Sequence, residues 1–464
     1  MVRLRWVATR ASIAMVVASS LVGSGALAGT AGAAGVPAGP ATAGASAPSG
    51  LSAGRVVDVP GTGSGPTAGT GTGVAPADAA ALPSDPDGEL TPLTPARIMD
   101  TRDGTGQAFP FPLVGGTPRD LQVTGVGGVP STGVDAVVLN VTVTEPNAAG
   151  YLSVWPAGQT RPTISSVNFV PGQVVPNLVT VQIGTGGRVS LYTGFGATHV
   201  VVDVVGFYAA VGGPSGSRFH STTPYRMLDT RTGQGAPIAP VVAGTPLALQ
   251  VTGVGGVPST GVTAVTLNVT VTNPTGSSVL TVYPSDVPRP LASNLNFTPG
   301  LTVANLVTVR VPANGVIDLA VLFGTTDVIA DVAGYYDGTK TDEHGRFRAL
   351  GPVRAVDTRD DNWPLGPGEG LFLNTSQLGD IDSLVINLTA VTPTSAGYLT
   401  VFPADVIEIP VASNLNFTPG QVVANQVDAR LSDIAYPNLP ANTFVVYNPM
   451  GDTHVVIDIF GYFT

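Results

Sequence analysis

The feature that most constrains the fold of this chain is a long internal repeat that occurs three times. Its clearest landmark, Asp100-Thr101-Arg102, returns as Asp229-Thr230-Arg231 and Asp357-Thr358-Arg359, at spacings of 129 and 128 residues. A copy of about 115 to 120 residues has the length of one β-sandwich domain and exceeds the repeats of solenoids and propellers. The sequence therefore predicts three copies of one domain.

Four motifs recur in every copy, in the same order. The first is Pro-x-Arg-x-x-Asp-Thr-Arg, which begins at Pro95, Pro224 and Pro352. An Asn-Val-Thr or Asn-Leu-Thr triplet follows, and after it comes an Asn-Phe pair with Pro-Gly just behind. Each copy closes with Asp-x-x-Gly and two aromatic residues. The triplets begin at Asn140, Asn268 and Asn387, the pairs at Asn168, Asn296 and Asn416, and the closing motifs at Asp203, Asp331 and Asp458.

Together these motifs resemble a repeat family of secreted actinobacterial proteins. The resemblance covers all three copies, roughly three quarters of the chain. In that family the modules stand alone or beside hydrolase domains, and they are described as cell-wall-associated or binding modules. The resemblance implies a location and a class of protein but no defined ligand. No catalytic domain accompanies the repeats here, so a role in delivering an enzyme is not indicated.

The motifs place β modules at residues 92–210, 221–337 and 347–464. Residues 1–28 read as a secretory signal peptide, because arginines precede an uncharged apolar stretch that ends in Ala26-Leu27-Ala28. A membrane anchor is the alternative reading of this stretch. Residues 29–91 are mainly Ala, Gly, Pro, Ser and Thr, a composition that predicts a disordered linker. No later stretch is long and apolar enough to span a bilayer, so no membrane span is expected in the mature chain.

Within a copy the pattern predicts an all-β fold. In the first module, segments of alternating polarity lie near 96–101, 119–124, 134–144, 150–155, 164–170, 176–183, 187–193 and 198–205. About eight strands favour a jelly-roll-like β-sandwich, with a small barrel as the alternative. The last strand is apolar on both faces except at His199 and Asp203, which predicts a central, doubly covered strand.

Composition excludes several classes of function. The chain has no cysteine, so it has neither disulfides nor thiolate metal sites. A net charge of −11 disfavours nucleic acid as a partner. No nucleotide-binding loop, hydrolase elbow or zinc-protease motif is present, and we expect no cofactor, no metal and no catalytic residue. The acidic surplus is concentrated in the third copy, with four Arg against twelve Asp and Glu.

The ionic residues in the strands predict a structural ion pair. Asp203 lies between Val201 and Val205, and a carboxylate among valines needs a partner because burying an unpaired charge is costly. Arg97 and Arg102 are the candidate donors, and a ligand-binding role for the Asp-Thr-Arg triplet is the alternative. The other copies would repeat the pair, as Asp331 with Arg226 or Arg231 and as Asp458 with Arg354 or Arg359.

An aromatic stripe gives the candidate ligand-binding residues. In the strand that ends at Trp155, Leu152 and Val154 face one way, while Tyr151, Ser153 and Trp155 face the other. The matching aromatic residues are Tyr283 in the second copy and Tyr398 and Phe402 in the third. If the aliphatic side is core, exposed rings beside hydroxyls would suit the apolar faces of sugars. Packing against a loop or a neighbouring domain is the alternative.

These observations predict a secreted or extracellular, cell-wall-associated protein without catalytic activity. Its three modules would bind cell-envelope glycan, an extracellular polysaccharide or another surface polymer, and repetition would raise the apparent affinity. A structural spacer or surface-assembly protein, in which the modules self-associate, is the first alternative. The second alternative is an unrecognised glycan-active hydrolase with paired carboxylates, for which the third copy has the richest supply of acids.

Overall fold

The computed structural model describes residues 51–59, 87–340, 344–435 and 439–464. The expected signal peptide lies outside these residues. Contacts divide the chain into residues 1–40 and residues 41–464, and every described residue belongs to the second unit. The regular secondary structure of the described residues consists of strands, apart from one 3₁₀ turn, η1 (Ser376–Leu378). Among them, no helix is long and apolar enough to cross a membrane.

Module 1 is a sandwich of two antiparallel sheets. The larger sheet has the order β2-β10-β5-β8, with β3 paired to β10, and the smaller has the order β4-β9-β6-β7. The strands are β2 (Leu90–Asp100), β3 (Leu113–Val114), β4 (Arg119–Gln122), β5 (Val134–Thr144), β6 (Gly150–Pro156), β7 (Val167–Phe169), β8 (Val175–Gln182), β9 (Arg188–Thr193) and β10 (Ala197–Ala209).

Module 2 repeats this topology, with sheets β11-β19-β14-β17 and β13-β18-β15-β16, and with β12 paired to β19. Its strands are β11 (Arg218–Asp229), β12 (Val241–Val242), β13 (Leu247–Gln250), β14 (Val262–Thr272), β15 (Ser278–Pro284), β16 (Leu295–Phe297), β17 (Val303–Arg310), β18 (Val316–Val321) and β19 (Thr325–Asp337).

Module 3 has the larger sheet β20-β27-β22-β25, but its smaller sheet contains an additional strand: β1-β21-β26-β23-β24. The strands are β1 (Ala53–Asp58), β20 (Phe347–Asp357), β21 (Glu369–Asn374), β22 (Ser383–Val391), β23 (Gly397–Pro403), β24 (Leu415–Phe417), β25 (Val422–Arg430), β26 (Thr443–Asn448) and β27 (His454–Phe463). β1 pairs with β21 in parallel, whereas the other strand pairs among the described residues of this module are antiparallel.

The all-β sandwich expected from the sequence is confirmed, and in module 1 the last strand, β10, is central as predicted. The two-residue strand β3 was not anticipated, because so short a segment shows no alternation. The expectation of a disordered linker over 29–91 is wrong at two places. Residues 53–58 form β1, because the valines of this Gly- and Ala-rich stretch pack against apolar side chains of module 3. β2 begins at Leu90, which is fully buried.

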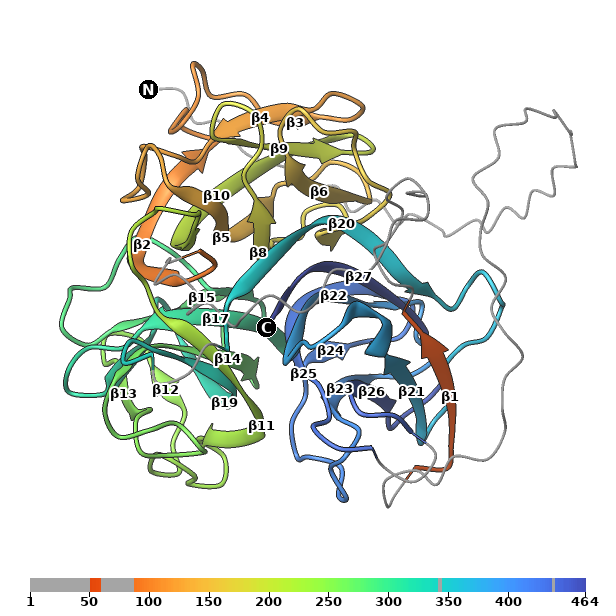
Figure 1. The fold of residues 1–464 in the computed structure, drawn as a ribbon. Helices are drawn as coiled ribbons and strands as arrows, with labels where there is room; N and C mark the ends of the chain where they lie inside the picture. The colour runs from red at the N-terminus through yellow and green to blue at the C-terminus, as the bar shows by residue number, and fades with distance from the viewer. Residues whose placement is uncertain (1–50, 60–86, 341–343, 436–438) are drawn as a thin grey trace, which may run out of the picture. The chain divides into compact units, whose positions relative to one another are not determined.

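The three sandwiches pack around a common centre. Figure 1 shows them as orange-to-yellow, green and blue groups of strands. The edge strands β8, β17 and β25 of the larger sheets each contact the other two. The largest hydrophobic cluster contains buried residues of all three modules, among them Val202, Leu306 and Phe463. We call the line along which the three larger sheets meet the pseudo-threefold axis.

A ring of buried asparagines joins the modules across this axis. Asn177 donates to Asn387 Oδ1 in module 3 at 2.9 Å, Asn305 to Asn140 Oδ1 in module 1 at 3.1 Å, and Asn425 to Asn268 Oδ1 in module 2 at 2.9 Å. Their own side-chain oxygens accept the backbone N–H groups of Gln426, Leu178 and Leu306, again in a neighbouring module. The bonds therefore close a cycle around the axis.

Further layers follow along the axis. Tyr208, Tyr336 and Phe463 occupy equivalent positions and lie fully buried, with 2.7 Å between the two tyrosine hydroxyls. At the ends of the first strands, the equivalent residues Glu89, Arg218 and Arg346 meet. Glu89 is 2% exposed and lies 3.3 Å from Arg218 and 3.8 Å from Arg346. The sequence thus differs between copies where the copies converge.

We predict that Asn305→Ala destabilises all three modules together. The substitution removes hydrogen bonds to Asn140, Asn294 and Leu178, and it leaves their buried polar groups unpaired. The expected loss is about 3 kcal/mol or more of the free energy of unfolding. Denaturant unfolding followed by probes in different modules should still give one transition, shifted for every probe. A shift confined to module 2 would contradict the shared ring.

Candidate functional site

The Asp-Thr-Arg triplet that recurs in each copy makes hydrogen bonds within its own module. Asp100 is 2% exposed and accepts hydrogen bonds from the guanidinium of Arg102 at 2.9 and 2.7 Å and from its backbone N–H at 3.0 Å. Thr101 Oγ1 lies 2.9 Å from His199 Nδ1 and accepts the backbone N–H of Val200. The triplet therefore ties the end of β2 to β10, and its main hydrogen bonds are made within the module.

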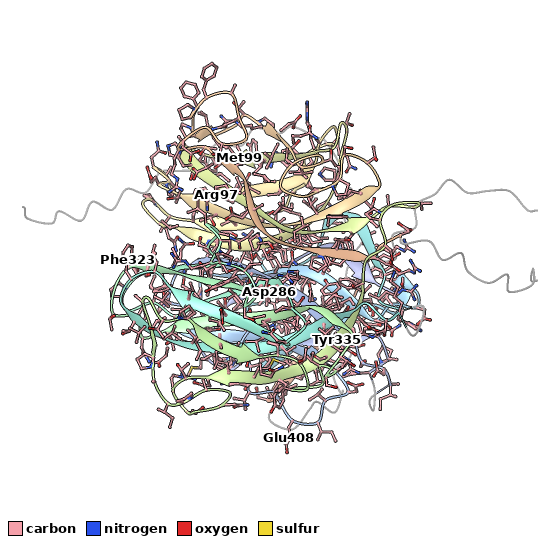
Figure 2. The ribbon with its side chains drawn as sticks, turned by 90° about the vertical axis from the view of Figure 1, so that its left-hand side faces the viewer. Arg97, Met99, Asp286, Phe323, Tyr335 and Glu408 are labelled. Atoms are coloured by element: carbon pink, nitrogen blue, oxygen red, sulfur yellow. The ribbon has the colours of Figure 1, made fainter. Side chains whose placement is uncertain are left out.

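The partner of Asp203 is Arg97. Its Nε lies 3.0 Å from Asp203 Oδ1, so the two residues pin the first strand to the last, as predicted. Arg102, the other candidate, pairs with Asp100 instead. Arg97 also donates to the carbonyl of Leu291 in module 2 at 2.9 Å, and Figure 2 labels it where the two modules meet.

The other copies repeat this arrangement. Asp331 pairs with Arg226 and Asp458 with Arg354, both at 2.9 Å, while Arg231 and Arg359 pair with the aspartates of their own triplets. Burial raises the pKa of Asp203, Asp331 and Asp458, although the arginine beside each opposes that rise. These buried ion pairs hold the first strand of each module against its last strand.

The aromatic stripe is not the exposed surface that a ligand-binding role would require. Trp155, Tyr283 and Phe402 are 3%, 4% and 1% exposed, and only Tyr151 and Tyr398 are half-buried. Alternation correctly separates the two faces of β6 but does not show what covers the second face. Loop carbonyls cover it, because Trp155 Nε1 donates to Gln159 O and Ser153 Oγ to Ile164 O. The alternative of packing is correct.

The strands that carry the stripe also meet the next module. β6 contacts β20 of module 3, β15 contacts β2 of module 1, and β23 contacts β11 of module 2. The face that would have bound sugars therefore lies near the junctions between modules.

A hollow of about 480 Å³ lies at one end of the pseudo-threefold axis, and residues of all three modules line it. We call it the axial hollow. Its apolar lining includes Val174 and Val175 of module 1, Leu301 and Phe323 of module 2, and Val423 of module 3. Phe323 is 63% exposed and Val174 39% exposed, so part of this apolar surface meets solvent. The volume lies within the usual range of small-ligand sites.

The axial hollow, the asparagine ring and the aromatic layer lie at successive levels along the axis. Figure 2 labels Phe323, from the axial hollow, and Tyr335, the neighbour of Tyr336 in the aromatic layer, at opposite sides of module 2. The strand β25 runs from Val423 and Ala424 in the hollow to Asn425 in the ring and on to Asp428. The asparagine ring therefore lies directly beneath the hollow and fixes the positions of its walls.

Amide side chains give the axial hollow its polar character, and no charged residue lines it. Gln173 and Gln421 occupy equivalent positions behind the Pro-Gly turns, and each uses its side-chain oxygen to accept a backbone N–H, of Val170 and Thr418 respectively. Asn296 and Asn416 likewise accept from Ser293 and Ser413. Among the described residues, these four amide nitrogens have no hydrogen-bond acceptor, so they are available as donors.

Sequence reasoning missed the asparagine ring and the hollow. The signal for the ring was present, since Asn-Leu-Val-Thr-Val at 177 and 305 and Asn-Gln-Val-Asp-Ala at 425 recur in the three copies. A buried asparagine within an apolar strand implies a specific partner. The hollow has no signal within a single copy, because its wall is assembled from three.

One buried carboxyl group on the axis has no arginine beside it. Asp428 stands where modules 1 and 2 have Thr180 and Thr308, and one of its oxygens has no hydrogen-bond partner. Burial raises the pKa of Asp428 to about 7, although Gln426 opposes the rise. Burial also raises the pKa of Tyr208 and Tyr336, with the charge of Asp428 adding to it.

Among the described residues, no group of three or more His, Asp or Glu side chains is placed to hold a metal ion. The acidic surplus of module 3 does not collect into such a cluster there.

Comparisons with known proteins give no family. No protein-family model matches the chain, and no curated protein matches it. Among solved structures, one of the triple jelly-roll fold and turret assembly in an archaeal virus is 8% identical, with a TM-score of 0.16 over 81% of this chain and 90% of that chain. The STIV MCP is 10% identical, with a TM-score of 0.15 over 53% of this chain and 97% of that chain. Similarity this low supports no argument about fold or function.

We predict that Arg97→Ala lowers the free energy of unfolding by about 3 kcal/mol, because it leaves the buried carboxylate of Asp203 without its cation. Arg102→Ala is the matched control: its side chain is 43% exposed, and the expected loss is about 1 kcal/mol or less. Asp203→Ala should also destabilise. Thermal melting of the three variants checks the order, and unchanged melting of Asp203→Ala would contradict the pair.

We predict that Asp428→Asn stabilises the protein above pH 7 and has little effect near pH 4. The folded pKa of about 7 exceeds the unfolded value of 3.8, so the fold favours the protonated form. Below pH 3.8 the carboxyl group of Asp428 is protonated in both states and does not lower the free energy of unfolding. As the pH rises toward 7, this stability is lost, by about 4 kcal/mol as an order of magnitude.

Denaturant unfolding from pH 4 to pH 8 measures this difference between variant and wild type. Asp428→Thr, which copies Thr180 and Thr308, is the control for packing, because it also removes the ionisable group. A constant difference across the pH range would argue against a titrating carboxyl group at this position.

Proposed function

We propose that this chain is an exported, non-catalytic binding protein that takes an uncharged segment of a cell-envelope glycan into the axial hollow. The observation that carries the proposal is the hollow itself: about 480 Å³, lined by three modules, partly apolar and free of charged residues. Export and the cell-wall location rest on the N-terminal sequence and on the resemblance of the repeats.

The chemistry of the lining supports an uncharged carbohydrate. Aliphatic side chains such as Val174 and Leu301 suit the apolar faces of a sugar ring, and Phe323 offers an exposed aromatic ring. The amide nitrogens of Gln173 and Gln421 can donate to hydroxyl or acetamido oxygens. An anionic polymer is disfavoured, because the chain carries a net charge of −11 and the hollow offers no cation.

The proposal changes the role of the repeat. The sequence analysis expected three equivalent sites whose weak affinities would add through multivalency. The axial hollow is instead one composite site, since each module supplies only part of the wall. Its preorganisation comes from the buried ring beneath it, which lowers the entropy cost of binding.

The test is a pull-down of the full chain on insoluble, uncharged cell-wall glycan. The double variant Gln173→Leu with Gln421→Leu places in modules 1 and 3 the residue that module 2 already carries as Leu301, so the turns should keep their fold. Loss of two donors should weaken binding by roughly tenfold or more. Phe109→Ala with Phe111→Ala is the control, because these exposed rings do not line the hollow.

Binding that survives in the Gln173→Leu, Gln421→Leu variant but is lost in the phenylalanine variant would remove the site from the hollow. The second candidate function, a structural unit in a surface assembly, is favoured by the buried stripe and by the close packing of the modules. It predicts that neither the wild type nor any of these variants is retained on glycan.

A further inference from the structure

Module 3 differs from its sister modules at one edge. In module 1 the outer face of the smaller sheet is polar, with Ser190 donating to Asp120. In module 3 the equivalent positions hold Phe372 and Val445, which are 1% and 0% exposed. They form an apolar cluster with Phe402, Ala404 and Leu439. Module 3 thus has apolar side chains at positions where module 1 has polar ones.

Strand β1, which precedes the three modules in the chain, lies at the edge of this sheet. Figure 1 shows it in red beside the blue β21. It pairs with β21 in parallel over six residues, from Ala53 opposite Glu369 to Asp58 opposite Asn374. The ladder extends at both ends, because Ser52 N donates to Gly368 O and Val59 N to Asn374 O, both at 2.8 Å.

The segment 51–59 fits this edge through its side chains as well as its backbone. Leu51 and Val56 pack on the Phe372 cluster, while Val57 and Val59 join the core on the other side. Arg55 pairs with Asp361 at 2.7 Å and lies over the ring of Trp363, 5.4 Å from its centroid. Asn374 donates to Asp58 at 2.8 Å. Recognition of this segment is therefore specific in sequence.

Gly54 is required by this fit. A Cβ at position 54 would lie 2.2 Å from the ring of Phe372, which is itself 1% exposed and cannot move aside without disturbing the cluster. Any larger residue at position 54 should prevent docking.

The covalent tie between β1 and the modules is long. Residues 60–86 separate Val59 from Asp87, and 27 residues span at most roughly 90 Å. Among the described residues, the strand pairing, ion pair and apolar contacts of β1 are made with module 3. The same ladder and the same side-chain contacts can therefore form whichever molecule supplies the strand. Exchange of an identical element between copies requires no new interface.

We propose that segment 51–59 and the edge at β21 form a donor and acceptor pair through which one copy of this chain joins a second. A free molecule satisfies the edge with its own segment, because the tether gives that segment a high effective concentration. At the density of a crowded surface, the segment of a neighbouring copy replaces it, and parallel strand addition links the two molecules.

The test uses two full-chain variants that complement each other. Gly54→Val cannot donate but keeps its acceptor edge, and Phe372→Asp, which copies Asp120 of module 1, cannot accept but keeps its segment. Each alone should sediment as a monomer, and the equimolar mixture should give a heterodimer. Hydrogen exchange at Val57 and Val59 should be fast in each variant and slow in the mixture. Phe372→Ala, which copies Ala248 of module 2, replaces Phe372→Asp if that variant folds poorly.

The control mixes the Phe372 variant with a chain that carries both substitutions, and no heterodimer should form. If the complementary mixture stays monomeric and the amides of Val57 and Val59 stay unprotected, the segment serves only its own molecule and the proposal is overturned. Neither substitution lines the axial hollow, so retention on glycan should be unchanged in both variants, and failure of this proposal is distinct from failure of the binding function.

Discussion

Three buried asparagines hold the molecule together as one body. Asn177, Asn305 and Asn425 each donate to a neighbouring module and accept a backbone N–H from that same module, so no module satisfies these buried amides alone. Inside a protein an unpaired amide is costly, and this cost makes the assembly of the ring close to all-or-none. We therefore expect the three repeats to fold as one unit, and the axial hollow needs all three modules because each supplies part of its wall.

Much of each module could be predicted from the sequence, because the information is local. The spacing of the repeats gave the copy length, alternation located the main strands, and Asp203 within an apolar strand required the arginine that the structure provides in Arg97. The exposed stripe was wrong for a physical reason. Alternation shows that Trp155 points away from Leu152, but whether that side meets water depends on a loop that folds back over it.

The relations between modules could not be read in the same way. A single copy does not encode the hollow, and β1 lies in a stretch whose Gly and Ala content masks three valines. The only sequence signal of the edge that pairs with β1 is a difference between the copies: Phe372 occupies the position of Asp120 and Ala248 in the other two. Comparison of the copies at equivalent positions is more informative than their average, because contacts between modules fall where the copies disagree.

The charged triad at the other end of the axis shows why the copies have become distinct. Glu89, Arg218 and Arg346 are equivalent residues that converge, and their attraction depends on their being unlike. Three identical copies of module 2 would bring three guanidinium groups to one point, and three copies of module 1 would bring three carboxylates, in each case with mutual repulsion in a poorly hydrated interior. The chain thus resembles a homotrimer whose subunits have been fused and have then lost the ability to replace one another. The three sandwiches therefore share one topology but differ in sequence at the axis, and no module can take the place of another there.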